Sequence, residues 1–251
     1  MMIDTRMSAL AALAGLAACS QPAPPETPPP AIQAQRASPQ VTAAPETRRA
    51  YFGELHLHTG YSFDAYALMG SRADPDAAYR FGRGEAVTYL GDTVRRSRPL
   101  DFMAVTDHSE YLGSFMRIDK EPQGGLAQSK GGKLMASNPL AAALGQLVSV
   151  LSGDEPTSAA MDDAMASAWK YEVDTANRYN QPGKFTTFVA YEWTTMQEGK
   201  YNLHRNVIFA DEGPAAPFTA TDSRRPEDLW DFLDAQRAMA LGQFLAIGAM
   251  D

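Results

Sequence analysis

The sequence predicts an α/β fold built on a parallel sheet or barrel, after a signal peptide and a disordered linker. Short apolar or β-branched runs, typical of buried strands, alternate with longer helical stretches. This alternation favours parallel strands that are joined by helices. A hydrophobic content of 45% and an aromatic content of 10% in 251 residues are ordinary for a chain with a globular core.

The first 50 residues carry export and tether signals. Met7–Ala18 is an apolar run of small residues, too short to span a bilayer and typical of a signal peptide over residues 1–18. Leu16–Cys19 resembles a bacterial lipobox, so we expect an acylated Cys19 that anchors the exported protein to a membrane of the bacterial cell envelope. An ordinary signal peptide with a chance cysteine is the alternative. Residues 19–50 are rich in proline and alanine and are expected to form an extended linker.

Residues 51–251 form the folded part, in which we expect five strands. Leu100–Thr106 is apolar, as buried parallel strands are, and Lys184–Tyr191 is β-branched and aromatic. The five expected strands are Tyr51–Leu57, Leu100–Thr106, Lys184–Tyr191, Asn206–Ala210 and Gln243–Ile247.

Helices are expected between these strands. Asp74-Pro75 and Pro226, which is followed by two acids, are typical helix starts. Gly153–Pro156 is a break between two helices, and Gln123–Lys133 reads as a loop without a phosphate-binding pattern. The expected helices are Asp74–Ala86, Asn138–Leu151, Ser158–Tyr179 and Pro226–Met239.

All four histidines lie where an expected strand meets a loop. His56 and His58 point to the same face of a strand and could bind one metal or two neighbouring metals, although a structural pair is an equal alternative. Asp64 follows His56 by eight positions, across the turn Thr59–Phe63. It could supply an oxygen ligand, or it could cap the turn.

Three further segments add polar side chains at strand ends. Asp107-His108 closes an apolar strand, where α/β enzymes build sites, and Asp107 could be a ligand or could orient an imidazole. Glu192 is either a bridging carboxylate or a solvated strand-end charge. His204 precedes a strand, which departs from this arrangement. Glu110 reads as an ordinary helix-start acid.

The charge balance limits the partners. A formal net charge of -8 argues against nucleic acid, which requires a basic face. A small anionic substrate remains compatible, because a bound cation reverses the local field. Arg205 is a candidate for holding such an anion, and a surface salt-bridge arginine is the alternative.

The order H-x-H, an acid eight positions after the first histidine, T-D-H, a strand-end Glu and a final His resembles the PHP (polymerase and histidinol phosphatase) metallohydrolases. The chain is similar, more narrowly, to the DUF3604 branch from Tyr51 to about Ala246, through the segments YFGELHLHTGYSFDAY, LDFMAVTDHSEYLG, FVAYEWT and LHRNVIF. The resemblance implies a distorted (β/α)7 barrel with two or three divalent metal ions, zinc, manganese or iron. It implies that Glu192 bridges two metals and that Asp107 supports the metal site, either directly or through a neighbouring ligand. The implied metal ligands are His56, His58, Asp64, His108, Glu192 and His204.

The function implied is metal-dependent hydrolysis of a small anionic phosphoester, with Asp107, Glu192 and Arg205 as catalytic candidates. An amidohydrolase-type enzyme and a non-catalytic, surface-anchored metal-binding lipoprotein are the alternatives. The family pattern continues with further histidines beyond the strand matching Phe244–Ile247, whereas this chain stops at Asp251. We therefore expect a C-terminally truncated, partial barrel, for which an inactive fragment is a further alternative.

Overall fold

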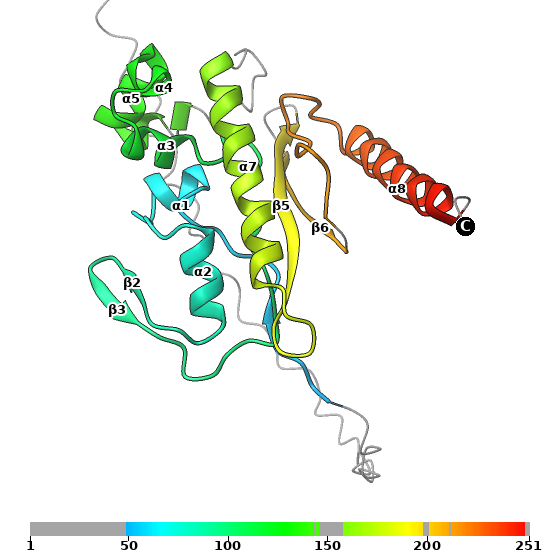
Figure 1. Ribbon diagram of the computed structural model, residues 1–251. Coiled ribbons are helices and arrows are strands. Elements are labelled where there is room, and N and C mark those ends of the chain that lie inside the picture. The colour runs from blue at the N-terminus through cyan, green and yellow to red at the C-terminus, as the bar shows by residue number, and fades with distance from the viewer. Residues whose placement is uncertain (1–48, 143, 146–157, 198–200, 211, 249–251) are drawn as a thin grey trace, which may run out of the picture. The chain divides into compact units, whose positions relative to one another are not determined.

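The computed structural model describes residues 49–142, 144–145, 158–197, 201–210 and 212–248 (Figure 1). The expected signal peptide, Cys19, nearly all of the linker and the break at Gly153–Pro156 lie outside the described residues. Within the described part, no helix is both long enough and apolar enough to cross a membrane.

The fold is mixed α/β, and its main element is a curled four-stranded sheet in the order β1-β4-β5-β6 (Figure 1). The β1–β4 and β4–β5 pairs are parallel, as predicted, whereas β5 and β6 are antiparallel. The strands span Gly53–Glu54 (β1), Phe102–Ala104 (β4), Thr186–Gln197 (β5) and Tyr201–Phe209 (β6). The predicted strands were therefore confirmed at these four positions, but the all-parallel sheet was not.

The β5–β6 hairpin is longer than the sequence pattern predicted. Its register runs from Val189 opposite Phe209 to Gln197 opposite Tyr201. In an antiparallel pair, the hydrogen bonds between the strands join backbone N–H and C=O groups whatever the side chains are. Both strands therefore continue through segments that are not apolar. Glu192 and His204 consequently lie inside strands and not at strand ends, which corrects the prediction for both.

Helices and a small hairpin surround this sheet. Asp74 caps α2 by accepting a hydrogen bond from Ala77 N at 3.0 Å, and Ser158 caps α7 through Met161 N. The helices are α1 (Phe63–Ala67), α2 (Pro75–Gly82), α3 (Ser114–Lys120), α4 (Gly125–Gln128), α5 (Lys130–Ser137), α7 (Ala159–Tyr179) and α8 (Pro226–Gly248). The hairpin pairs β2 (Val87–Tyr89) with β3 (Asp92–Val94).

Two predictions about these elements were wrong. Gln243–Ile247 lies in α8 and is not a strand. The periodicity of a short apolar run does not distinguish a strand from a helix. The helix that begins at Pro226 continues through this run because Leu and Ala are good helix formers. The expected loop Gln123–Lys133 contains α4 and the start of α5, which Ser129 caps through Gly132 N. Of the expected helix Asn138–Leu151, residues 139–142 and 144–145 are helical, and residues 143 and 146–151 are not described.

The two faces of β5 have different surroundings, and this difference positions the site. One face packs under α7, where the Trp169 ring meets Tyr191 edge-on at 5.6 Å and Thr187 Oγ1 donates to the Ala176 carbonyl (Figure 1). Side chains alternate between faces along a strand. Glu192 and Thr194 therefore point to the face that α7 does not cover.

Candidate metal centre

The site forms where the chain leaves β1 and β4, beside the middle of β5. Thr106 N donates to the Leu57 carbonyl at 2.9 Å, which places the His56–His58 segment beside the end of β4. On the other side, Ser109 N donates to the Glu192 carbonyl at 2.8 Å, so the backbone at His108 runs parallel to β5. Three separate segments of chain thus bring their side chains to one place.

The Glu192 carboxylate lies at the centre of the histidines, with its side chain 1% exposed. Its Oε1 lies 3.2 Å from Nε2 of His56. Its Oε2 lies 3.1 Å from Nε2 of His58 and 3.1 Å from Nδ1 of His108. The same oxygen lies 3.3 Å from Nδ1 of His204. All four histidines of the chain therefore surround one carboxylate.

Asp64 closes the other side of the cluster from the first turn of α1. Its carboxylate oxygens lie 3.2 Å from Nδ1 of His58, and Oδ2 lies 3.6 Å from Nε2 of His108. Asp64 Oδ1 also accepts from Ala65 N at 2.6 Å, so the side chain is fixed locally as well. The turn Thr59–Phe63 thus returns this carboxylate to the histidines.

These six side chains form three overlapping groups whose potential ligand atoms lie within 4.8 Å of one another, as a metal ion requires. The groups are His56, His58 and Glu192; His58, Asp64 and His108; and His108, Glu192 and His204. The structure therefore brings together all six residues that the resemblance implied as ligands.

Two buried atoms of the cluster have no hydrogen-bond partner among the described residues, namely Nε2 of His58 and Oε2 of Glu192. They lie 3.1 Å apart but lack hydrogen-bonding geometry. A buried polar group without a partner is unusual in a folded protein. Both atoms are electron-pair donors for a cation, so the donor set fits a metal ion.

The charges in the cluster are strongly coupled. Although burial lowers the pKa of His58, the hydrogen bond with Asp64 and the nearby carboxylate of Glu192 outweigh burial and raise this pKa to about 10. Burial favours neutral carboxyls, yet the imidazoles of His108 and His58 hold the pKa of Asp64 far below its usual value. The pKa of Glu192 is lowered against burial in the same way, by His204 and His58.

Asp107 belongs to none of the three groups. Its buried carboxylate accepts hydrogen bonds from the backbone N–H and the hydroxyl of Thr59, and from Ser62 Oγ at 2.8 Å. Ser62 Oγ in turn accepts from His108 N at 2.9 Å. Asp107 therefore braces the turn that leads from the H-x-H segment to Asp64.

Arg205 lies away from the cluster. It neighbours His204 in β6, so its side chain points to the opposite face of the strand. Its Nη1 donates to the backbone carbonyl of His204 at 2.8 Å, and its side chain is exposed.

Sequence reasoning missed two residues that contact this site. Thr194 Oγ1 lies 2.7 Å from Nδ1 of His108 and 3.2 Å from Nδ1 of His204. Glu110 is 1% exposed and accepts from Thr194 N at 3.2 Å and from Ala220 N at 2.9 Å. Burial raises the pKa of Glu110 to about 7. It precedes α3 by a turn, so its interpretation as a helix-start acid was wrong. For Thr194, the sequence signal was its position two residues after Glu192, because such residues of a strand point to the same face.

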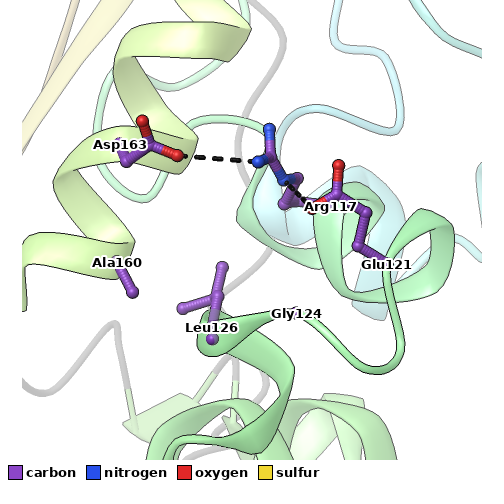
Figure 2. A pocket seen from close by; sticks show the side chains of 7 residues that line it. Arg117, Glu121, Gly124, Leu126, Ala160 and Asp163 are labelled. Carbon is purple, nitrogen blue, oxygen red and sulfur yellow. Dashed lines mark hydrogen bonds and ion pairs between the residues drawn. The ribbon is translucent and has the colours of Figure 1, made fainter.

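A separate surface pocket is formed by α3, α4 and the start of α7 (Figure 2). Arg117 lies between two acids there, 2.8 Å from Glu121 and 3.5 Å from Asp163. None of the six cluster residues lines this pocket, so we do not connect it with the metal centre.

Residues 45–249 match the family described as "Protein of unknown function (DUF3604)". The chain belongs to the DUF3604 family. The match covers the entire cluster, from His56 to His204. No curated protein and no solved structure matches this DUF3604 chain significantly.

Proposed function

We propose that this DUF3604 protein is a metal-dependent hydrolase of the PHP type that acts on a phosphoester. The observation that carries the proposal is the pair of buried, unpartnered donor atoms on His58 and Glu192, surrounded by further imidazoles and carboxylates. Imidazole and carboxylate together suit zinc, manganese and iron.

The three overlapping groups would hold two or three divalent ions. Glu192 belongs to two of the groups and would bridge neighbouring ions. His58 and His108 also belong to two groups each. A bound divalent ion lowers the pKa of its water to about 7 and so supplies hydroxide at neutral pH. The two carboxylates, Asp64 and Glu192, would balance part of the added positive charge.

The cluster is accessible to solvent, as a hydrolase requires, most of all at His56 and His204. The side chains of His56 and His204 are 58% and 38% exposed, whereas Glu192 and His108 are buried. A substrate would approach from the His56 and His204 side. Because Arg205 points to the other face, the charge of an anionic phosphoester would be met by the cations and not by this arginine.

We also propose that the protein is exported and anchored to the cell envelope through lipidated Cys19. The apolar run before Cys19 and the proline-rich segment after it support this location. Incorporation of labelled palmitate, abolished by Cys19→Ser, would test it.

The decisive experiment for the hydrolase proposal combines metal analysis with a substrate panel. We expect purified protein to contain zinc, manganese or iron, and to hydrolyse a phosphomonoester or phosphodiester. Chelation and the double variant His56→Ala/His58→Ala should each remove most of the activity. Turnover that persists after chelation would refute the metal mechanism, and bound metal without turnover on the whole panel would favour a metal-binding protein.

A further inference from the structure

The Thr194 hydroxyl contacts two of the imidazoles, and it is held rigidly. Its side chain lies within hydrogen-bonding distance of Nδ1 of His108 and Nδ1 of His204, at 2.7 and 3.2 Å. Thr194 is 3% exposed, and its backbone is fixed by pairing opposite His204 and by the N–H bond to Glu110. A buried β-branched side chain in a strand has little rotamer freedom.

Two oxygen atoms are possible hydrogen-bond partners of Nδ1 of His108. One is Thr194 Oγ1 at 2.7 Å, and the other is Glu192 Oε2 at 3.1 Å. Glu192 Oε2 makes no hydrogen bond with any described residue, so Thr194 Oγ1 is the hydrogen-bond partner of this nitrogen. The hydroxyl has one proton, which it can donate to Nδ1 of His204 while it accepts from Nδ1 of His108. The opposite ring nitrogen, Nε2, lies 3.6 Å from Asp64 Oδ2, which is too long for a hydrogen bond.

We propose that Thr194 is a positioning residue that fixes the tautomer of His108 with its proton on Nδ1. A neutral imidazole carries one N–H, so this tautomer leaves the lone pair of Nε2 unprotonated. Nε2 faces Asp64, which assigns His108 to the group with His58 and Asp64.

The consequence for metal binding rests on the proposed function. His108 belongs to two of the three groups, but an Nδ1 that carries a proton cannot ligate. Thr194 therefore excludes His108 from the group with Glu192 and His204, and leaves Glu192 Oε2 free for a cation. Hydrogen-bond partners of metal-ligating histidines act in this way in other sites, where their removal costs about 10- to 100-fold in metal affinity.

Three substitutions in the full chain separate this role from packing. Thr194→Val keeps the shape and removes the hydroxyl, and Thr194→Ser restores the hydroxyl. Thr195→Val is the matched control, because Thr195 is equally buried, lies on the opposite face and has no hydrogen-bond partner among the described residues for its hydroxyl.

The first measurement is ¹⁵N NMR of the histidine rings in chelator-treated protein, which is feasible with four histidines. At a pH where the His108 ring is neutral, we expect the Nδ1–H tautomer in the unsubstituted protein, in Thr194→Ser and in Thr195→Val. Thr194→Val should show a tautomer mixture. The second measurement is zinc affinity by competition, which should fall about 10- to 100-fold in Thr194→Val only.

Two results would overturn the inference. One is an Nε2–H tautomer of His108 in the unsubstituted, chelated protein, which requires no variant to fold. The other is an unchanged tautomer in folded Thr194→Val. Failure of the unsubstituted protein to take up zinc would instead refute the proposed function, while the tautomer measurement still decides the role of Thr194.

Discussion

Nε2 of His58 and Oε2 of Glu192 lie 3.1 Å apart in the interior of the site, and neither makes a hydrogen bond within the described structure. If a cation satisfies both atoms, a neutral amide at position 192 should be a poor replacement, because it cannot bridge two cations as a carboxylate does. We expect Glu192→Gln to lose at least one equivalent of metal by elemental analysis and most of the hydrolytic activity. Glu227→Gln, in the exposed first turn of α8, is the control and should change neither. Full metal content in Glu192→Gln would contradict the bridging role.

The raised pKa of His58 predicts the pH dependence of metal binding. In the metal-free protein this pKa is about 10, because Asp64 and Glu192 outweigh the opposing effect of burial. Below that pH the ring is protonated, so a metal ion must displace a proton to bind it. Affinity should therefore rise with pH from 6 to 9, by about tenfold per unit for one displaced proton. Zinc competition assays at several pH values would measure this slope, and a flat profile would exclude His58 as the displaced group.

The same shift predicts how stability varies in the absence of metal. A histidine whose pKa is raised on folding stabilises the protein fully below its unfolded value of 6.5, and this contribution is lost as the pH rises toward about 10. Chelated protein should thus become easier to denature with urea between pH 7 and 9. His58→Gln should flatten this part of the profile. An equally steep profile in His58→Gln would assign the effect to another group.

Asp107 and Asp64 should respond differently to the same substitution. In the hydrogen bonds described, the carboxylate of Asp107 accepts only from Thr59 and Ser62. Asp107→Asn should therefore keep the metal content while losing roughly 1–3 kcal/mol of stability. Asp64→Asn, which changes a carboxylate that faces His58, should lose metal with a smaller effect on unfolding. Metal analysis and urea denaturation of both variants would test this contrast. Equal metal loss in both would place Asp107 among the ligands.

Glu172 of α7 should destabilise the fold at neutral pH. It is 4% exposed, neither carboxyl oxygen has a hydrogen-bond partner among the described residues, and burial together with Asp107 raises its pKa well above 4.5. The folded state then binds more protons than the unfolded state, so stability falls as the pH rises above 4.5. Glu172→Gln should gain roughly 1–3 kcal/mol at pH 8 and little at pH 4, as measured by urea unfolding. A gain that is independent of pH would point to packing instead.

The family resemblance implied all six clustered residues, and the arrangement of strands accounts for part of the set, because parallel strands end at a common edge of the sheet. His56, His58 and His108 follow this rule. Glu192 and His204 reached the cluster by another route, the antiparallel hairpin, whose length depends on pairing that no local pattern contains. The prediction of a strand at Gln243–Ile247 was wrong, because a short apolar run is compatible with a helix as well as with a strand.

Residues that act through neighbours were harder to predict. Arg205 adjoins His204 in sequence, yet strand alternation sends the two side chains to opposite faces. Thr194 is an ordinary strand residue in the sequence, and its hydroxyl acquires a role only because His108, 86 positions earlier, folds against it.

The two halves of the cluster have different origins in the chain, and this affects how the site assembles. Glu192, Thr194 and His204 come from consecutive strands that pair with each other, so local contacts can bring them together early in folding. His56 and His58 arrive only after the chain closes a loop of 49 residues to place Leu57 beside Thr106, and a further loop to reach β5. From these sequence separations we expect the hairpin to form before the other segments dock on it. A cation that binds the hairpin residues first would accelerate the later step, whereas a cation that requires all six would bind only to the finished fold.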